Sequence, residues 1–443
     1  MNRFFVGLMV SVVWVVLVRH EAAALSFQLT KVVDENTPLP GQGVGTFNGL
    51  DDDGMAISGQ HVLILCTGDA NGDSGLYLHD GVLLTEVAFE GDPVPGLPGV
   101  TFSRFDDDMH GMEVSSVGFR ARFDDGVPDN GYDEVVITAA GGVLTNRADT
   151  VNTICPSTGT TFDGLYHPGL SGGAVAFCGG VDDGTGNVST GVYTDASGTL
   201  TTVVDTSTPV PGLPGHSFFS FSQYVAFDGS IGILAYLDDW NDETAFLATP
   251  EGALTPIADT ISTLSPSTGV VFENLNNPVV EGSYFVFGGT DADGFEGIYT
   301  NVLGGLSVVA DENTDVPAQP GETFLEFRLR QLSMDGTRIV FEGTSTAGLG
   351  GIYLWDNGVL SLVVEKNIIL DGRPVLDFNL TFADSMSGDR ILLQVDFPDG
   401  FDGIYVAEPS TTGAVIPEPA TIAIWSLLAG LGIGVGWRRR KRV

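Results

Sequence analysis

Aspartate, asparagine and glycine gather in five short stretches, and their side chains are the ones in this sequence best suited to binding a metal ion. The stretches are Asp69–Asp73, Asp124–Glu134, Asp182–Asn187, Asp238–Glu243 and Asp291–Asp293. Calcium takes about six to eight oxygen ligands, which two or three carboxylates and some backbone carbonyls could supply. No stretch completes an EF-hand loop, and hairpin turns need the same residue types. Calcium binding and simple turn formation therefore both remain open.

Two serines lie in motifs that suggest nucleophilic catalysis. Gly169–Gly173 fits the G-x-S-x-G pattern around Ser171, and Ser74 lies in the sequence GDSG at positions 72–75. A nucleophile elbow requires a sharp strand-to-helix turn. Both motifs instead coincide with turns or strand starts that recur along the chain. We therefore expect no catalytic residue at either position.

Histidines and cysteines form no recognisable framework. Five histidines follow the first 24 residues without a metal-ligand spacing, namely His61, His79, His110, His167 and His216. Three cysteines are too few for a disulfide scaffold. Cys155 and Cys178 fall in one repeat unit and could pair in an oxidising compartment. The other interpretation is that these two and Cys66 are small buried hydrophobic residues.

The residues around these motifs recur along the chain. A phrase similar to V-V-D-x-x-T-P-x-P-G begins at Val32, Val87, Val203 and Val309, with weaker copies from Arg147, Ile257 and Val363. Each copy is followed by a phenylalanine: Phe47, Phe102, Phe162, Phe218, Phe272, Phe324 or Phe378. A turn glycine then precedes an apolar run, and five of these glycines are 52–57 residues apart: Gly172, Gly229, Gly282, Gly336 and Gly388.

A third phrase, glycine–apolar–tyrosine, completes the unit at Gly75–Tyr77, Gly191–Tyr193, Gly297–Tyr299, Gly351–Tyr353 and Gly403–Tyr405. The chain thus contains seven units of roughly 52–60 residues, each with about four short strands. Radial repetition of four-stranded units predicts an all-β fold, a seven-bladed β-propeller over residues 25–408. The segment from Leu332, LSMDGTRIVFEGTSTAGLGGIYLWD, also resembles the TolB-type, WD40-like propeller repeat.

The register of the repeat predicts how the ring closes. The first strand, near Phe27–Val33, carries the phrase that elsewhere ends a unit, and the last unit stops after its third strand. We therefore expect Phe27–Val33 to pair beside Gly403–Val406 and complete the last blade, which leaves no free sheet edge.

The charge distribution excludes one class of partner. The chain has 57 acidic and 18 basic residues, a formal charge of −39, and only 11 basic residues lie between Leu25 and Ala420. Such a body repels phosphate backbones, so we expect no nucleic-acid binding. The acidic surface keeps the protein soluble, and it would attract divalent cations or basic partners.

The two ends of the chain have the sequence patterns of targeting signals. Residues 1–24 combine Arg3, an apolar run over Phe4–Val18 and three alanines, as in a secretory signal peptide that signal peptidase removes. At the other end, a linker over 409–416 leads to Pro417-Glu418-Pro419. An uncharged stretch over 420–437 follows, long enough for a transmembrane helix, and then a basic cluster of Arg438, Arg439, Arg440, Lys441 and Arg442.

This C-terminal pattern closely resembles the PEP-CTERM sorting signal. The resemblance covers only residues 417–443, and it implies recognition by an exosortase in bacteria that make extracellular polysaccharide. It also implies an inner-membrane anchor that is transient, removal of the tail, and transfer of the body to the cell envelope or extracellular matrix. A plain C-terminal anchor is the other interpretation of the same residues.

These observations favour a non-enzymatic binding, adhesion or structural module displayed at the surface, with extracellular polysaccharide as a partner and no required cofactor. The alternative is a secreted propeller enzyme acting on polysaccharide, a lyase or a glycosidase, which needs paired carboxylates. No pair can be selected from so many acidic residues. An enzyme would be recognised by a break in the repeat, and the unit containing 104–126 departs most from the others.

Overall fold

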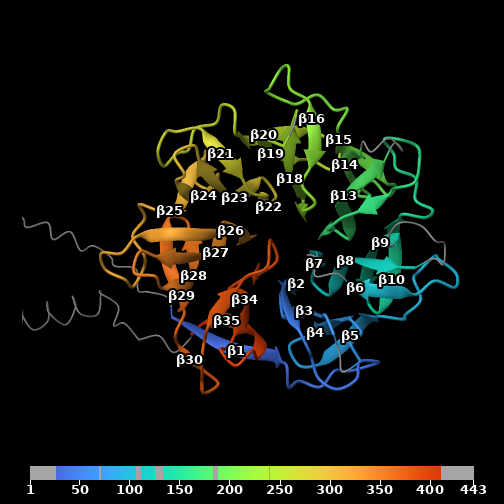
Figure 1. Ribbon diagram of the computed structural model, residues 1–443, viewed down its shortest axis with the longest axis horizontal. Helices are drawn as coiled ribbons and strands as arrows, with labels where there is room; N and C mark the ends of the chain where they lie inside the picture. The colour runs from blue at the N-terminus through green and yellow to red at the C-terminus, as the bar shows by residue number, and fades with distance from the viewer. Residues whose placement is uncertain are drawn as a thin grey trace, which may run out of the picture.

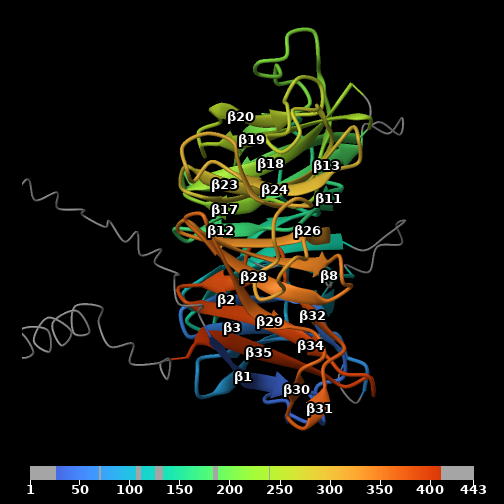
Figure 2. The same cartoon turned by 90° about the vertical axis from the view of Figure 1, so that its left-hand side faces the viewer.

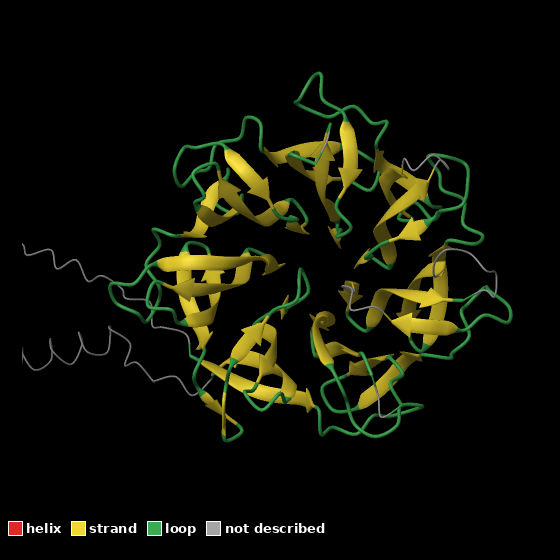
Figure 3. Ribbon diagram, in the orientation of Figure 1, coloured by secondary structure: helices red, strands yellow, loops and turns green. Residues whose placement is uncertain are grey.

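The computed structural model describes residues 26–68, 71–105, 111–124, 133–182, 188–238 and 240–410. These residues form strands and loops, without a helix (Figure 3). No helix in this part of the chain is therefore long and apolar enough to cross a membrane. The signal peptide predicted at 1–24 and the sorting signal predicted at 417–443 lie outside the described residues.

Seven antiparallel sheets of four or five strands are arranged around a central axis (Figure 1). The predicted seven-bladed β-propeller is thereby confirmed.

Blade 1 contains β2 (Leu50–Ser58), β3 (His61–Cys66), β4 (Gly75–His79) and β5 (Leu84–Phe89). Blade 2 contains β6 (Phe102–Phe105), β7 (Gly111–Glu113), β8 (Ser116–Phe123), β9 (Asp133–Ala140) and β10 (Val143–Asp149). Blades 3 and 4 contain β11 (Gly164–Leu165), β12 (Gly169–Ser171), β13 (Ala174–Asp182), β14 (Val188–Thr194) and β15 (Thr201–Asp205), then β16 (Phe218–Phe221), β17 (Ala226–Asp228), β18 (Ser230–Leu237), β19 (Asp242–Ala248) and β20 (Leu254–Asp259).

The remaining three blades follow the same plan. Blades 5 and 6 contain β21 (Phe272–Leu275), β22 (Val279–Glu281), β23 (Tyr284–Asp291), β24 (Glu296–Thr300) and β25 (Ser307–Asp311), then β26 (Phe324–Asp335), β27 (Arg338–Ser345), β28 (Gly350–Asp356) and β29 (Val359–Glu365). Blade 7 contains β32 (Asp377–Asn379), β33 (Met386–Ser387), β34 (Arg390–Asp396), β35 (Asp402–Pro409) and β1 (Phe27–Asp34). A small hairpin of β30 (Ile369–Leu370) and β31 (Arg373–Pro374) lies between blades 6 and 7 in the chain.

The ring closes by pairing its first strand with its last, as the repeat register predicts. β1 is antiparallel to β35, with Phe27 opposite Pro409 and Asp34 opposite Gly403. Figure 2 shows the two strands side by side, next to the β30–β31 hairpin. Because β1 supplies the outer strand of blade 7, the backbone groups of β35 are paired on both sides.

The recurring glycine–apolar–tyrosine phrase has a packing reason. In blade 5 a Cβ atom added at Gly297 would lie 2.5 Å from the hydroxyl oxygen of Tyr299, so only glycine leaves room for the buried ring. The ring meets Phe272 edge to face with centroids 5.0 Å apart. Equivalent phenylalanine–tyrosine pairs lie in three other blades: Phe47–Tyr77, Phe162–Tyr193 and Phe324–Tyr353. Each pair adds about 0.5–1.5 kcal/mol beyond its buried area.

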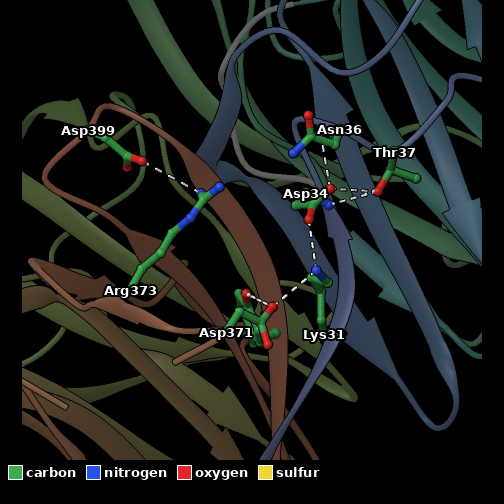
Figure 4. Close-up of polar contacts among 8 residues, drawn as sticks. Lys31, Asp34, Asn36, Thr37, Asp371, Arg373 and Asp399 are labelled. Carbon is green, nitrogen blue, oxygen red and sulfur yellow. Dashed lines mark hydrogen bonds and ion pairs between the residues drawn. The ribbon is translucent and has the colours of Figure 1, made fainter. Parts of the chain in front are cut away.

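The aspartate in the other recurring phrase closes a turn. At the end of β1, a carboxylate oxygen of Asp34 accepts hydrogen bonds from the backbone N–H of Asn36 and the hydroxyl of Thr37, at 3.0 and 3.1 Å (Figure 4). The Thr37 hydroxyl oxygen in turn accepts the N–H of Asp34 at 3.0 Å. The same turn recurs in other blades, at Asp149, Asp205, Asp259 and Asp311. These aspartates recur because they satisfy backbone donors.

Candidate functional site

One end of the central channel is surrounded by the last residue of each innermost strand. These residues are Ser58, Glu113, Ser171, Asp228, Glu281, Asp335 and Ser387, and they line a cavity of about 230 Å³. The set includes four carboxylates, so this end of the channel is acidic. We call it the acidic mouth.

The residues of the acidic mouth join neighbouring blades. In each blade, a backbone N–H at the turn after the innermost strand donates to the acidic-mouth residue of the preceding blade. The pairs, with the donor first, are Gly59–Ser387, Val114–Ser58, Gly173–Glu113, Gly229–Ser171, Gly282–Asp228, Gly336–Glu281 and Gly388–Asp335. The acceptor is a side-chain oxygen in six pairs and the backbone carbonyl of Asp228 in the other. Hydrogen bonding between neighbouring blades, rather than binding of a shared ligand, therefore explains why polar side chains occupy these positions.

The two serine motifs also have structural roles. Ser171 ends β12, and its hydroxyl oxygen accepts the N–H of Gly229 at 3.0 Å. The following residues turn directly into β13, so the G-x-S-x-G sequence forms a strand-to-strand turn instead of a strand-to-helix elbow. Ser74 is 3% exposed, and its hydroxyl oxygen accepts the N–H of Phe105 in the next blade.

A loop of blade 7 enters the channel above the acidic mouth. The segment between β32 and β33 runs towards the centre of the ring (Figure 1), and Asp384 lies on it and lines the cavity. The carbonyl of Asp384 accepts the N–H of Ile57 at 2.9 Å, which fixes the loop to blade 1. Burial, with a smaller contribution from the negative charge of Asp228, raises the pKa of the Asp384 carboxyl to about 8. This group therefore retains its proton at neutral pH.

Three glutamates at equivalent positions of the third strands connect blades further along the channel. Glu134, Glu243 and Glu296 each accept a backbone N–H from the innermost strand of the next blade. The donors are Leu165 at 2.7 Å, Leu275 at 2.6 Å and Phe327 at 3.1 Å. Burial raises the pKa of Glu243 and Glu296. Their recurrence in blades 2, 4 and 5 indicates that they are part of the scaffold.

The surface feature that best suits a ligand is a groove between blades 3 and 4, at the end of the ring opposite the acidic mouth. It has a volume of about 380 Å³ and is lined by Tyr166, Val188, Thr190, Ser220–Tyr224, Tyr236 and Trp240. Trp240 is 61% exposed, with its ring 4.8 Å from that of Tyr236 and 5.1 Å from that of Phe219, which is 42% exposed. We call this surface the aromatic groove. It combines open aromatic faces with hydroxyl and amide groups.

A second pocket adjoins the aromatic groove and shares Tyr224 with it. It has a volume of about 340 Å³ and is lined by Tyr224, Asn277, Arg328–Gln331 and Phe382. Tyr224 of blade 4 stacks on His167 of the neighbouring blade 3, with ring centroids 4.4 Å apart. We call this the arginine pocket, because two of the few basic residues of the body line it.

The aspartate-rich turns do not assemble a metal site within the described residues, where no group of three or more His, Cys, Asp or Glu side chains could hold an ion. Asp291 accepts the N–H groups of Asp293 and Phe295 and the hydroxyl of Thr268. Asp238 accepts the N–H of Ser217 and pairs with His216. Both carboxylates therefore stabilise turns and loops within their own blades. Parts of the other turns, at 69–70, 125–132, 183–187 and 239, lie outside the described residues.

The three cysteines are buried and form no disulfide, so the structure favours the hydrophobic interpretation over pairing of Cys155 with Cys178. Burial raises the pKa of the Cys178 thiol to about 12. The predicted sorting motif, Pro417, Glu418 and Pro419, and the basic cluster from Arg438 to Arg442 lie outside the described residues.

The aromatic groove was not predicted from the sequence. Trp240 lies within the aspartate-rich stretch Asp238–Glu243, and no sequence pattern singled out Phe219 or Tyr236. One signal was available, because a tryptophan within a polar turn has no apolar neighbours along the chain to bury it.

Solved structures similar to this chain are propellers with low sequence identity. The β-propeller domain of the trilobed protease from Pyrococcus furiosus is 6% identical with a TM-score of 0.46, over 82% of this chain and 95% of that one. A polysaccharide lyase, Uly1, is 10% identical with a TM-score of 0.45, over 87% and 100%. A puromycin-hydrolyzing peptidase from Mycobacterium tuberculosis is 12% identical with a TM-score of 0.45, over 83% of this chain but 52% of that one. These similarities concern the fold and carry no argument about activity.

No curated protein matches this sequence. A family model matches residues 22–264, which is more than half of the chain and spans the first four blades. The chain belongs to that family, described as a family of unknown function, DUF7453.

Proposed function

We propose that this protein is an exported, surface-displayed propeller that binds polysaccharide through the aromatic groove. The observation that carries the proposal is the group of three aromatic rings beside a groove of hydroxyl and amide side chains: Trp240 and Phe219 are exposed, and Tyr236 is half-buried. The apolar faces of sugar rings pack on aromatic rings, while sugar hydroxyls need hydrogen-bond partners. The groove supplies both kinds of contact.

Two further features support an extended ligand. The groove continues into the arginine pocket through Tyr224, so the combined surface accommodates more than one sugar residue. The groove is also built from two blades, since Tyr166 and Thr190 belong to blade 3 and the aromatic group to blade 4. A rigid scaffold that positions such groups needs little reorganisation on binding.

The cellular location of the protein is the second part of the proposal and rests on the sequence. The signal peptide at 1–24 would direct export. The PEP-CTERM-like segment at 417–443 would hold the protein at the membrane until an exosortase removes the tail. A protein delivered in this way would meet extracellular polysaccharide outside the cell, which agrees with a sugar-binding groove.

A glycan array with the full-length protein tests the binding function. We expect Trp240→Ala to weaken binding of the retained glycans tenfold or more, because aromatic anchors dominate the energetics of such interfaces. Val359→Ala is the matched control, since Val359 is 50% exposed and begins β29 in blade 6, away from the groove. Equal binding by both variants, or no glycan retained by the wild type, would contradict the proposal.

A further inference from the structure

The arginine pocket presents a guanidinium group that the fold does not use. Arg330 is exposed and has no hydrogen bond or ion pair with the described residues. Its neighbour Arg328 is fully engaged, with Nε 3.2 Å from Glu342, Nη1 2.6 Å from Asn379 and Nη2 3.1 Å from Asp377. The two arginines of one short segment therefore have different roles.

The segment that carries Arg330 is a bulge held at two points. Between Phe327 and Leu332 the pairing of β26 with β27 is interrupted, so that Arg328–Gln331 lie opposite Glu342 alone. A bulge of this kind redirects side chains out of the sheet. Leu329 anchors it on blade 5, where a Cβ atom added at Gly288 would lie 2.6 Å from the Leu329 Cβ. Arg328 anchors it on blade 7 through its bonds to Asp377 and Asn379.

The charge balance around the bulge leaves Arg330 as the group available to an anion. Glu342 is buried, and burial raises the pKa of its carboxyl to about 7, although the positive charges of Arg328 and Lys366 lower it. Lys366 lies 3.3 Å from Glu342 and 2.5 Å from Asp377. The positive charges of Arg328 and Lys366 are thus balanced inside the network. The charge of Arg330 is not balanced in this way.

Two observations place a ligand group beside Arg330. The pocket also contains Asn277, whose buried Oδ1 atom has no hydrogen-bond partner among the described residues. Oδ1 is an acceptor, and a buried acceptor without a donor costs free energy, which a bound sugar hydroxyl or water recovers. The second observation is geometric, because Tyr224 lines both the arginine pocket and the aromatic groove. Arg330 is therefore close enough to the aromatic groove to share one ligand with it.

We propose that the arginine pocket is the acidic-sugar subsite of the aromatic groove, in which Arg330 binds the carboxylate of a hexuronic acid residue while a neighbouring sugar packs on Trp240. The inference rests on the proposed polysaccharide-binding function. A planar guanidinium donates two parallel hydrogen bonds to a carboxylate, which suits one acidic group at a fixed position. The whole chain carries a formal charge of −39 and repels a densely charged polyanion, so the ligand is a mainly neutral polysaccharide with spaced carboxylates.

The test compares two probes that differ only in charge. One is an oligosaccharide containing neutral hexose and hexuronic acid, and the other is the same oligosaccharide with its carboxyl groups reduced to alcohols. Full-length protein is titrated with each probe by calorimetry. We expect the wild type to bind the acidic probe about tenfold more tightly, because hydrogen bonds to charged groups are about twice as strong as neutral ones.

Variants assign that preference to Arg330. Arg330→Gln should abolish the preference, chiefly by weakening binding of the acidic probe, whereas Arg330→Lys should retain part of it. Arg338→Gln is the control, since it removes the same charge from blade 6 at the turn beside the acidic mouth. Equal wild-type affinity for both probes, or equal effects of the Arg330 and Arg338 variants, would overturn the acidic subsite while leaving the binding function intact. Absence of binding to both probes would overturn the two proposals together.

Discussion

The ammonium nitrogen of Lys31, on β1, lies 3.0 Å from a carboxylate oxygen of Asp371 in the β30–β31 hairpin (Figure 4). The same nitrogen lies 2.8 Å from Asp34 on its own strand. Hydrogen bonds to Asp34 and Asp371 raise the pKa of Lys31. The Tyr405 hydroxyl of β35 also donates to Asp371, at 2.9 Å. The first strand, the last strand and the hairpin thus meet at one polar cluster where the ring closes.

Deletion of residues 25–34 should open the ring and cause aggregation. Without β1, the backbone donors and acceptors on one side of β35 lose their partners and form an edge that pairs with other chains. Size-exclusion chromatography with light scattering measures the change as a shift from one defined species to large assemblies.

Lys31→Ala provides the control for the deletion. Lys31 is partly exposed, and ion pairs of this kind contribute about 0–1 kcal/mol, so this variant should keep its oligomeric state and lose little stability. If the deletion variant stays soluble and unassembled, the pairing of β1 with β35 is not what protects that edge.

The closure of the ring could be predicted because it depends on the order of repeated phrases. The phrase at Val32 ends a unit wherever else it occurs, so its position at the start of the body implied a shared blade. The phenylalanine and tyrosine positions were also visible, since Phe272 and Tyr299 recur at fixed places in the unit. These features are local and repeated, and each copy supports the others.

The candidate site could not be predicted for the opposite reason. Trp240, Tyr224 and Arg330 come from three separate segments, and none of them belongs to the repeat. Their proximity depends on blade geometry and on a bulge in β26 that sequence spacing does not reveal. Sequence alone also left calcium binding and turn formation open at Asp238 and Asp291, whose carboxylates accept hydrogen bonds within the scaffold.

Ser171→Ala should reduce stability without affecting any sugar-binding activity. The hydroxyl oxygen of Ser171 accepts the N–H of Gly229, and loss of one such bond costs about 0.5–1.5 kcal/mol. Denaturant unfolding measures the difference, with Ser115→Ala in an exposed turn as the control. A catalytic serine would give the reverse result, with an activity lost and stability unchanged.

Asp384 should make the protein less stable as the pH rises from about 4 to about 8. The folded state keeps the proton of this carboxyl up to a pKa of about 8, whereas the unfolded chain releases it near its ordinary value of 3.8. Over that interval the unfolded state binds fewer protons, so the free energy of unfolding falls with increasing pH. Asp384→Asn removes this pH-dependent loss of stability. The melting temperature of the variant should therefore exceed that of the wild type by an amount that grows up to about pH 8 and then levels off.

Melting temperatures measured from pH 5 to pH 9 test this assignment. Asp293→Asn is the matched control, because Asp293 is exposed and lies in a surface turn. The control and the wild type should give parallel curves. Parallel curves for Asp384→Asn as well would mean that the carboxyl does not keep its proton in the fold.

The last prediction concerns the C-terminal tail. The apolar stretch over 420–437 and the basic cluster that follows should stop transfer through the membrane, with the cluster on the cytoplasmic side. Pro417-Glu418-Pro419 would then lie at the outer boundary of the membrane. Each proline fixes its backbone and disfavours helix before it, so we expect an extended motif that a processing enzyme can reach. We expect protein isolated from a host with an exosortase to lack Arg438–Val443.

Expression in a host without an exosortase supplies the comparison. There the tail should remain, and the protein should stay in the membrane fraction, because nothing separates the body from its apolar segment. Mass spectrometry of the C-terminal peptide distinguishes the two products. Replacing Glu418 with alanine in the exosortase host should also preserve the tail if the motif itself is recognised. An intact Arg438–Val443 terminus on surface-localised protein from the native host would instead leave only the plain anchor.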